Sequence, residues 1–138
     1  MAKNLYIISG CNGAGKTTAS YTVLPEILDC REFVNADEIA RGYTVRLLFF
    51  WLNSPELALQ RIAERVAKGG HNIPEPIARR RYVAGINNLF RLFMDEVDYW
   101  AIFDNSETPR KKIAIGGKNA DIEIYYHKLY ENMKAYVK

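Results

Sequence analysis

The feature that most constrains this chain is a glycine-rich loop that directly follows a short apolar segment. The loop is Gly10-Cys11-Asn12-Gly13-Ala14-Gly15-Lys16-Thr17-Thr18 and satisfies the pattern G-x-x-x-x-G-K-[ST]. Residues 4–9 read as a buried strand, and residues 17–28 carry apolar side chains at helical spacing, although Pro25 ends or kinks that helix. A strand, a tight loop and a helix in this order predict a phosphate-binding loop. The alternative is a glycine-rich turn between two core elements.

Each residue type in such a loop has a physical task. Glycines let the backbone curl so that successive N–H groups point at the β-phosphate, and the helix that starts at Lys16 adds the positive end of its dipole. We expect the phosphates to be bound by Gly10, Asn12, Gly13, Ala14, Gly15, Lys16, Thr17 and Thr18. In that set Lys16 reaches the β- and γ-phosphates, and the Thr17 hydroxyl is the ligand for Mg²⁺. Cys11 is interpreted as a small loop filler rather than a redox group.

Length and composition narrow the class of protein. With 138 residues, of which 49% are hydrophobic, the chain predicts one domain over 1–138 that is short for a sheet covered on both faces. A formal net charge of +3 does not by itself argue for nucleic acid as a partner. Cys11 and Cys30 make no disulfide framework, which favours a cytoplasmic location. The chain begins with a strand rather than a signal segment, and its longest apolar run, residues 47–52, cannot span a membrane.

Strands and helices alternate along the rest of the sequence, which predicts an α/β fold. Strands are expected over 33–36, 43–52, 100–103 and 111–115, with the second of them central in the sheet because it is almost continuously apolar. A helix is expected from Ser54, as N-cap with Pro55 at the first position, to about Lys68. Longer helices follow over 77–97 and 120–137. The predicted inward-facing residues are Leu59, Ile62, Ala63 and Val66, then Val83, Ile86, Leu89, Phe90, Phe93 and Val97, then Ile122, Tyr125, Tyr126, Leu129, Tyr130 and Met133.

Asp37 is the candidate catalytic carboxylate. It follows the apolar run 33–36, so that a strand would deliver it to the edge where open α/β sheets bind ligands. There it would serve as general base or as the group that orients an acceptor hydroxyl. Capping of the following helix is the alternative.

A cluster of arginines flanks the polar loop that begins at Gly69-Gly70-His71. Arg61 and Arg65 lie on the helix before the loop, and the run Arg79-Arg80-Arg81 lies in the first turns of the helix after it. Guanidinium groups on a segment of this kind, at about residues 61–82, are typical of a mobile lid that closes on phosphates. A solvated helix face is the alternative for each arginine. His71 either contacts phosphate or caps a helix end.

Most of the chain resembles a known family. The stretches that carry the resemblance are I-I-S-G-C-N-G-A-G-K-T-T, F-V-N-A-D-E-I-A, F-F-W-L-N-S-P-E, K-G-G-H-N-I-P, R-R-R-Y and F-D-N-S. In this order they are similar to the small zeta-toxin-like P-loop kinases, also described as predicted ABC-type ATPases. The resemblance implies a three-layer P-loop NTPase fold with a mostly parallel sheet. It also implies phosphoryl transfer from ATP or GTP, with Mg²⁺, to a hydroxyl of a small molecule, which in characterised zeta toxins is a UDP-N-acetyl amino sugar.

The resemblance also assigns roles to single residues. Lys16 and Thr17 are then the phosphate and metal residues, with Lys16 counted as catalytic together with Asp37. Arginines of the cluster serve the lid: Arg65 and Arg80 in catalysis, Arg61 and Arg81 in nucleotide binding. An antitoxin protein is left open as a partner.

The chain departs from the family between Gly42 and Tyr43. Family members carry there a further helical segment and a strand that ends in a motif like F-E-T-T-L, so this sheet is expected to lack one strand. The missing stretch would supply acceptor-site residues, including an acidic and a hydroxyl group. No apolar run ends in Asp-Glu as a second metal carboxylate, and Asp104 ends a strand without an assigned role.

Two functions therefore compete. The first is a kinase for a small hydroxyl-bearing metabolite, and the second is a nucleotide-binding module, or weak ATPase, that keeps the donor half of the site without the acceptor half. An ABC transporter ATPase is excluded by the short chain and by the lack of an L-S-G-G-Q-like signature. Nucleic-acid binding through the arginines is the weakest reading, and it would show as steeply salt-dependent association.

Overall fold

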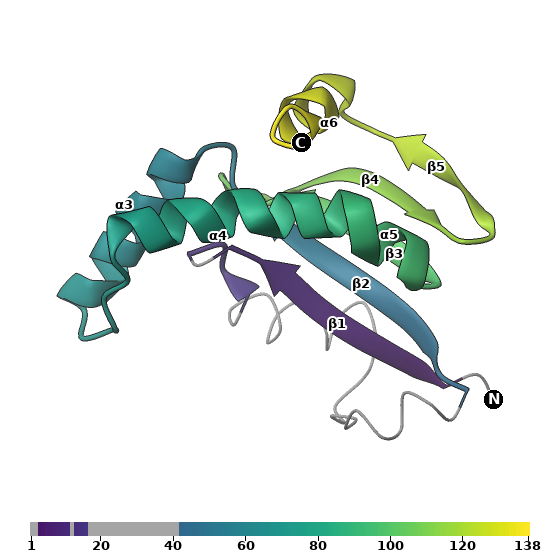
Figure 1. Cartoon of the computed structure of the whole chain (residues 1–138), viewed down its shortest axis with the longest axis horizontal. Coiled ribbons are helices and arrows are strands. Elements are labelled where there is room, and N and C mark those ends of the chain that lie inside the picture. The colour runs from purple at the N-terminus through teal and green to yellow at the C-terminus, as the bar shows by residue number, and fades with distance from the viewer. Residues whose placement is uncertain (1–2, 12, 17–41) are drawn as a thin grey trace.

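Five strands form one mixed sheet, and their order in the sheet follows their order in the chain. The computed structural model describes residues 3–11, 13–16 and 42–138, so the helix expected over 17–28 and the strand expected over 33–36 lie outside the described residues. The strands are β1 (Asn4–Gly10), β2 (Thr44–Trp51), β3 (Tyr99–Asp104), β4 (Lys111–Gly117) and β5 (Ala120–Ile124). β1, β2 and β3 are parallel neighbours, whereas β4 and β5 follow as antiparallel strands (Figure 1).

The strongest apolar run of the sequence forms β2, which lies between β1 and β3 as expected for a central strand. Its side chains are buried without interruption from Leu47 to Trp51. Burial on both faces explains why this segment shows no alternation of polar and apolar residues. Because the three parallel strands are in register, with Gly10 beside Phe50 and Phe50 beside Phe103, their carboxyl ends meet at one edge.

Helix α3 (Pro55–Ala67) begins and ends where the sequence predicts. At its start the Ser54 hydroxyl accepts a hydrogen bond of 3.1 Å from the Leu57 N–H, which satisfies one of the free donors of the first turn. At its end the Gly69 and Gly70 N–H groups donate to the carbonyls of Val66 and Arg65. This is the Schellman pattern, and Gly69 adopts the φ of +97° that the pattern requires.

The inward face of α3 differs from the predicted stripe. Ala58 and Ile62 are the buried residues of the helix, Leu59 and Val66 are half-buried, and Ala63 is exposed. The buried residues therefore lie nearer the start of the helix than predicted. There Ala58 and Ile62 pack against the glycine-rich loop.

The second long helix, predicted over 77–97, forms and contains one π-helical turn. Helix α4 (Glu75–Asn88) starts two residues early, because Pro76 fits the first turn while the Ile77 and Ala78 N–H groups donate to the Pro74 carbonyl. A π-helical turn, η2 (Leu89–Phe93), and a short helix, α5 (Met94–Glu96), complete the segment. Leu89 and Val97 are buried as predicted.

The predicted C-terminal helix over 120–137 is wrong in its first third. Residues 120–124 form β5, which pairs with β4, and helix α6 begins only at His127 and ends at Lys134. Ile122, Tyr125 and Tyr126 are accordingly exposed by 57%, 45% and 43%, whereas Tyr130 and Met133 face the core as expected. The spacing of apolar residues in 120–126 suits a strand as well as a helix, and pairing with β4 decides between them.

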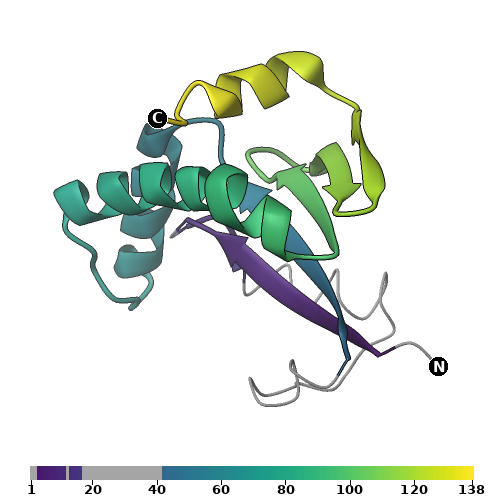
Figure 2. The same cartoon turned by 45° about the vertical axis from the view of Figure 1, so that its right-hand side comes forward.

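The described helices gather on one face of the sheet, as the two views show (Figures 1 and 2). Tyr82 of α4 reaches the end of β2, where its hydroxyl donates a 2.6 Å hydrogen bond to the Leu52 carbonyl. Tyr130 of α6 packs edge-on against Phe90 of η2. The C-terminus returns to α4, because the Asn87 side chain bonds both the Tyr136 carbonyl and the Lys138 N–H.

Candidate functional site

The candidate site lies at the edge where β1, β2 and β3 end. The loop after β1 leaves the strand at Gly10 and turns so that the Ala14 N–H donates to the Cys11 carbonyl. Gly10, Gly13 and Gly15 have φ of +147°, +84° and +83°, a region that residues with a Cβ rarely adopt. A strand and a curled loop therefore follow one another as the sequence predicts, and the helix expected after Lys16 lies outside the described residues.

Lys16 folds back over this loop. Its ammonium donates a 2.8 Å hydrogen bond to the Gly10 carbonyl, so the side chain spans the mouth of the loop rather than extending into solvent. The charge is near enough to favour the thiolate form of Cys11, as is the charge of Arg61. Burial is nevertheless the larger effect, and it raises the pKa of the Cys11 thiol from its ordinary 9.0 to about 11. The loop thus has two cations, Lys16 and Arg61, near a neutral, buried thiol.

A three-residue turn after β3 holds the loop from one side. The Asn105 side-chain amide donates a 2.7 Å hydrogen bond to the Ala14 carbonyl, and its backbone N–H donates to the Trp51 carbonyl at the end of β2. Gly15 lacks a side chain where Asn105 approaches, since a Cβ there would overlap the amide nitrogen. Asn105 therefore ties the loop to the sheet.

The same turn is organised by a buried carboxylate. Asp104 is 7% exposed, and its Oδ1 accepts hydrogen bonds from both the N–H and the hydroxyl of Ser106. The Ser106 hydroxyl in turn accepts from the Asn53 N–H at 2.9 Å. Asp104 lies at the end of β3, which β2 separates from β1. Its Oδ1 already accepts the two hydrogen bonds from Ser106. We therefore assign it a positioning role in the turn.

Helix α3 holds the loop from the other side. A Cβ at Gly13 would lie 3.0 Å from the Ala58 carbonyl oxygen and 3.2 Å from the Arg61 Cβ, so the loop backbone is pressed against the helix. The Arg61 guanidinium donates a 2.9 Å hydrogen bond to the Ser106 carbonyl. Arg61 thus lies beside the loop and also joins α3 to the turn after β3.

The other predicted site residues are distributed unevenly. Arg65, Arg80 and Arg81 are exposed on α3 and α4. Arg79 of α4 forms a 3.0 Å ion pair with Glu56 of α3 and another of 3.0 Å with Glu75 of its own helix. These bonds raise the pKa of the Arg79 guanidinium, and the bond to Arg79 lowers the pKa of Glu56. His71 is exposed in the connection between the helices. Asn12, Thr17, Thr18 and Asp37 lie outside the described residues.

Sequence reasoning missed Asn105 and Ser106. Both follow the strand predicted over 100–103, but the sequence assigns them no role. Their contacts with residues 14 and 53 bridge more than fifty positions of sequence. A polar triplet at the end of an apolar strand was the available signal, because such triplets lie at the ligand-binding edge of α/β sheets.

Comparisons with known proteins show the fold. No family model matches the chain, and neither does any curated protein. One chain in the crystal structure of AvrRxo1-ORF1:AvrRxo1-ORF2 with sulphate ions matches 96% of this chain, with a TM-score of 0.67 and 13% sequence identity. The match covers 63% of that chain, so this chain spans less than two thirds of its length. The likeness shows an α/β fold with a five-stranded mixed sheet that has a solved counterpart.

Two further features concern the described residues, 3–11, 13–16 and 42–138. None of the helices there is long and apolar enough to cross a membrane. No group of three or more histidine, cysteine, aspartate or glutamate side chains there is arranged to hold a metal ion.

Proposed function

We propose that this chain is a P-loop nucleotide-binding protein of the zeta-toxin-like kinase type, which transfers a phosphoryl group from ATP or GTP to a hydroxyl of a small molecule. The observation that carries the proposal is the conformation of the loop from Gly10 to Lys16. Three glycines with positive φ, a lysine ammonium over the loop mouth and the start of a helix are the elements that cradle a triphosphate.

The residues around the loop suit the donor half of such a reaction. On arrival of a nucleotide, the Lys16 ammonium would exchange the Gly10 carbonyl for phosphate oxygens, which are stronger acceptors because they are charged. Arg61 adds a second cation at the same edge. Magnesium would neutralise phosphate charge, and the motif assigns its protein ligand to the Thr17 hydroxyl.

A second candidate function is a binding module or weak ATPase without acceptor chemistry. One observation favours it: the hollow beside the turn after β3, lined by Asn53, Asp104, Ser106 and Lys111 among others, has a volume of about 100 Å³. Pockets for drug-sized ligands typically measure about 300–1,000 Å³. This hollow by itself is too small for a nucleotide sugar.

One experiment separates the two functions. Purified protein is incubated with γ-labelled ATP or GTP, Mg²⁺ and UDP-N-acetylglucosamine, and both labelled sugar and free phosphate are quantified. A kinase yields labelled sugar that disappears in Lys16→Ala. Labelled phosphate alone, also dependent on Lys16, supports the binding module, and no Lys16-dependent product together with no nucleotide binding contradicts both.

Asp37 has its own test in the same assay. Asp37→Asn removes the proposed base but preserves shape, so transfer is expected to fall by about 100-fold or more while ATP affinity stays within about twofold. Loss of ATP affinity in Asp37→Asn would instead indicate a residue of the metal site.

A protein partner is part of the proposal. A solved neighbour is a structure of AvrRxo1-ORF1 with AvrRxo1-ORF2. The resemblance to zeta-toxin-like proteins leaves an antitoxin open as a partner. We propose that this chain binds an antitoxin of its own. Co-expression with the neighbouring open reading frame, followed by size-exclusion chromatography, tests this: co-elution supports it, and independent elution contradicts it.

A further inference from the structure

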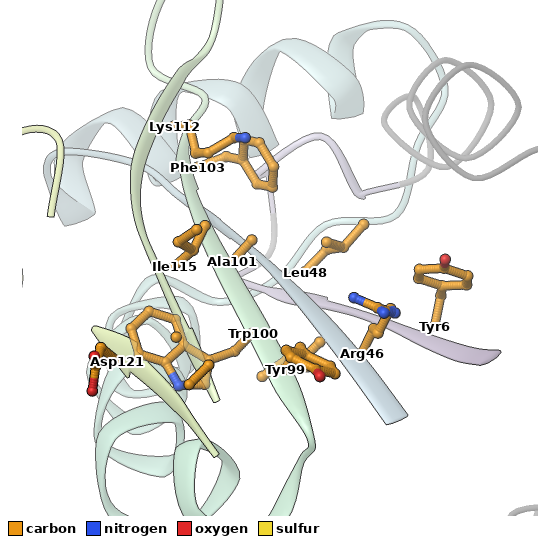
Figure 3. A pocket seen from close by; sticks show the side chains of 13 residues that line it. Tyr6, Arg46, Leu48, Tyr99, Trp100, Ala101, Phe103, Lys112, Ile115 and Asp121 are labelled. Atoms are coloured by element: carbon orange, nitrogen blue, oxygen red, sulfur yellow. The ribbon is translucent and has the colours of Figure 1, made fainter. Parts of the chain in front are cut away.

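A second cavity lies on the sheet face that the described helices leave uncovered. Its volume is about 500 Å³, within the range of small-molecule pockets. Because side chains alternate along a strand, Arg46 and Leu48 lie on the opposite face of β2 from Leu47 and Phe49. Figure 3 shows the side chains that line this cavity, and none of them belongs to the loop from Gly10 to Lys16.

The cavity has flat apolar walls. Tyr6, Arg46 and Tyr99 are neighbours in register across β1, β2 and β3, and Leu48 and Phe103 continue the surface toward the carboxyl ends of the strands. Figure 3 shows the Arg46 side chain between the rings of Tyr6 and Tyr99. Walls formed by aromatic rings favour a planar occupant, because offset stacking adds to simple burial.

Arg46 brings a fixed positive charge into this apolar surface. Its Nε donates a 3.1 Å hydrogen bond to the Asn4 side-chain oxygen, and its guanidinium stacks 4.4 Å from the centre of the Tyr99 ring. Among the described residues, no carboxylate lies within ion-pair distance of Arg46. A half-buried guanidinium that is held in place without a counter-ion is suited to bind an anion.

Two other charged side chains, Lys112 and Asp121, line the cavity. Lys112 lines the cavity near Phe103, with its ammonium 6.0 Å from the centre of the Tyr125 ring. Asp121 lines it near Trp100, on the far side of Tyr99 from Arg46 (Figure 3). Two cations and one carboxylate favour a ligand with a single negative charge.

We infer that this face of the sheet is a binding site for a planar aromatic carboxylate, whose carboxylate pairs with Arg46 while its rings lie on Leu48, Tyr99 and Phe103. The site is separate from the phosphate loop, so the inference stands independently of the proposed kinase function.

The test uses 2-naphthoate as the probe and 2-naphthamide as its neutral control, with affinities measured by titration calorimetry. The acid is expected to bind the wild-type protein at least about tenfold more tightly than the amide, as for a hydrogen bond to a charged group. In Arg46→Gln the acid should fall to the level of the amide, whereas the amide should keep its affinity. Arg91→Gln, at an exposed arginine of η2, is the matched control and should change neither.

Two further variants keep the result decisive. Ala101→Leu narrows the cavity floor and should weaken both probes, and Lys16→Ala should weaken neither. Thermal melts establish that each variant is folded, and Arg46→Met, which keeps an apolar stem without the charge, replaces Arg46→Gln if the latter does not fold. Equal affinity for acid and amide, no binding of the acid by the wild-type protein, or dependence of binding on Lys16 instead of Arg46 would each overturn the inference.

Discussion

At the scale of single residues, Cys11 shows how burial decides the character of a functional loop. The thiol is 8% exposed, and two neighbouring cations do not offset the cost of burying a thiolate, so its pKa rises to about 11. A thiol that stays protonated at neutral pH is a poor nucleophile. This agrees with its interpretation as a filler of the loop.

The raised pKa of Cys11 predicts a loss of stability at high pH. Between pH 9 and 11 the thiol ionises in the unfolded chain but stays protonated in the folded one, so the folded state binds more protons and loses stability as pH rises. The full contribution is at most about 3 kcal/mol. Urea denaturation at pH 8, 9 and 10 should show a steeper decline for the wild type than for Cys11→Ala, and parallel declines would contradict this assignment.

Asn105 holds the glycine-rich loop through its side chain. Asn105→Ala removes the bond to the Ala14 carbonyl and should lower MgATP affinity by about threefold to tenfold, with a loss in unfolding free energy of about 1 kcal/mol. Asn105→Asp places a carboxylate against that carbonyl and near the phosphates, so it should bind MgATP more weakly still. If Asn105→Asp binds as well as the wild type, Asn105 does not position the loop.

At the scale of elements, helix α3 links the fold to the site, since it carries Arg61 and packs against Gly13. Ser54→Ala removes its N-cap and should cost about 1 kcal/mol, which lowers the melting temperature by roughly 3–5 °C. Ser54→Asp retains an acceptor and should melt close to the wild type. Equal melting of the alanine and aspartate variants would mean that the cap contributes nothing.

Two glycines at α3 and α4 should respond oppositely to the same substitution. Gly85 is inside α4 with open space around its Cα, so Gly85→Ala should raise the unfolding free energy by about 0.5–1 kcal/mol. Gly69 also has open space but a φ of +97°, so Gly69→Ala should lower it by about 1 kcal/mol. Chemical denaturation measures both, and effects of the same sign would show that backbone conformation does not control these positions.

At the scale of the whole molecule, short sequence patterns predicted the features that depend on neighbouring residues. The loop after β1, the cap and the end of α3, and the central place of β2 follow from short patterns whose physical causes act within a few residues. Strand β5 could not be predicted in this way, because Ile122 and Ile124 fit the spacing of a helix as well as that of a strand. Only pairing with β4 selects the strand. The role of Asn105 was equally hidden, since its partner lies 91 positions away.

The two halves of the proposed kinase site rest on different parts of the chain. The fold has a solved counterpart that this chain matches over 96% of its own length, although at 13% identity. The proposed donor half of a kinase site rests on the loop, on Lys16 and on Arg61. The acceptor half rests on Asp37 and on residues expected from the family between Gly42 and Tyr43, so the nucleotide is the firmer part of the proposal.

The most direct test of the account is therefore titration of the protein with MgATP and MgGTP by calorimetry. The account predicts saturable binding of at least one of them, weakened at least about tenfold in Lys16→Ala because a charged partner of the phosphates is lost. Lys128→Ala, at an exposed lysine of α6, should bind as the wild type does. Failure of both nucleotides to bind, or equal binding by Lys16→Ala and the wild type, would contradict the claim that the loop from Gly10 to Lys16 is a phosphate-binding site.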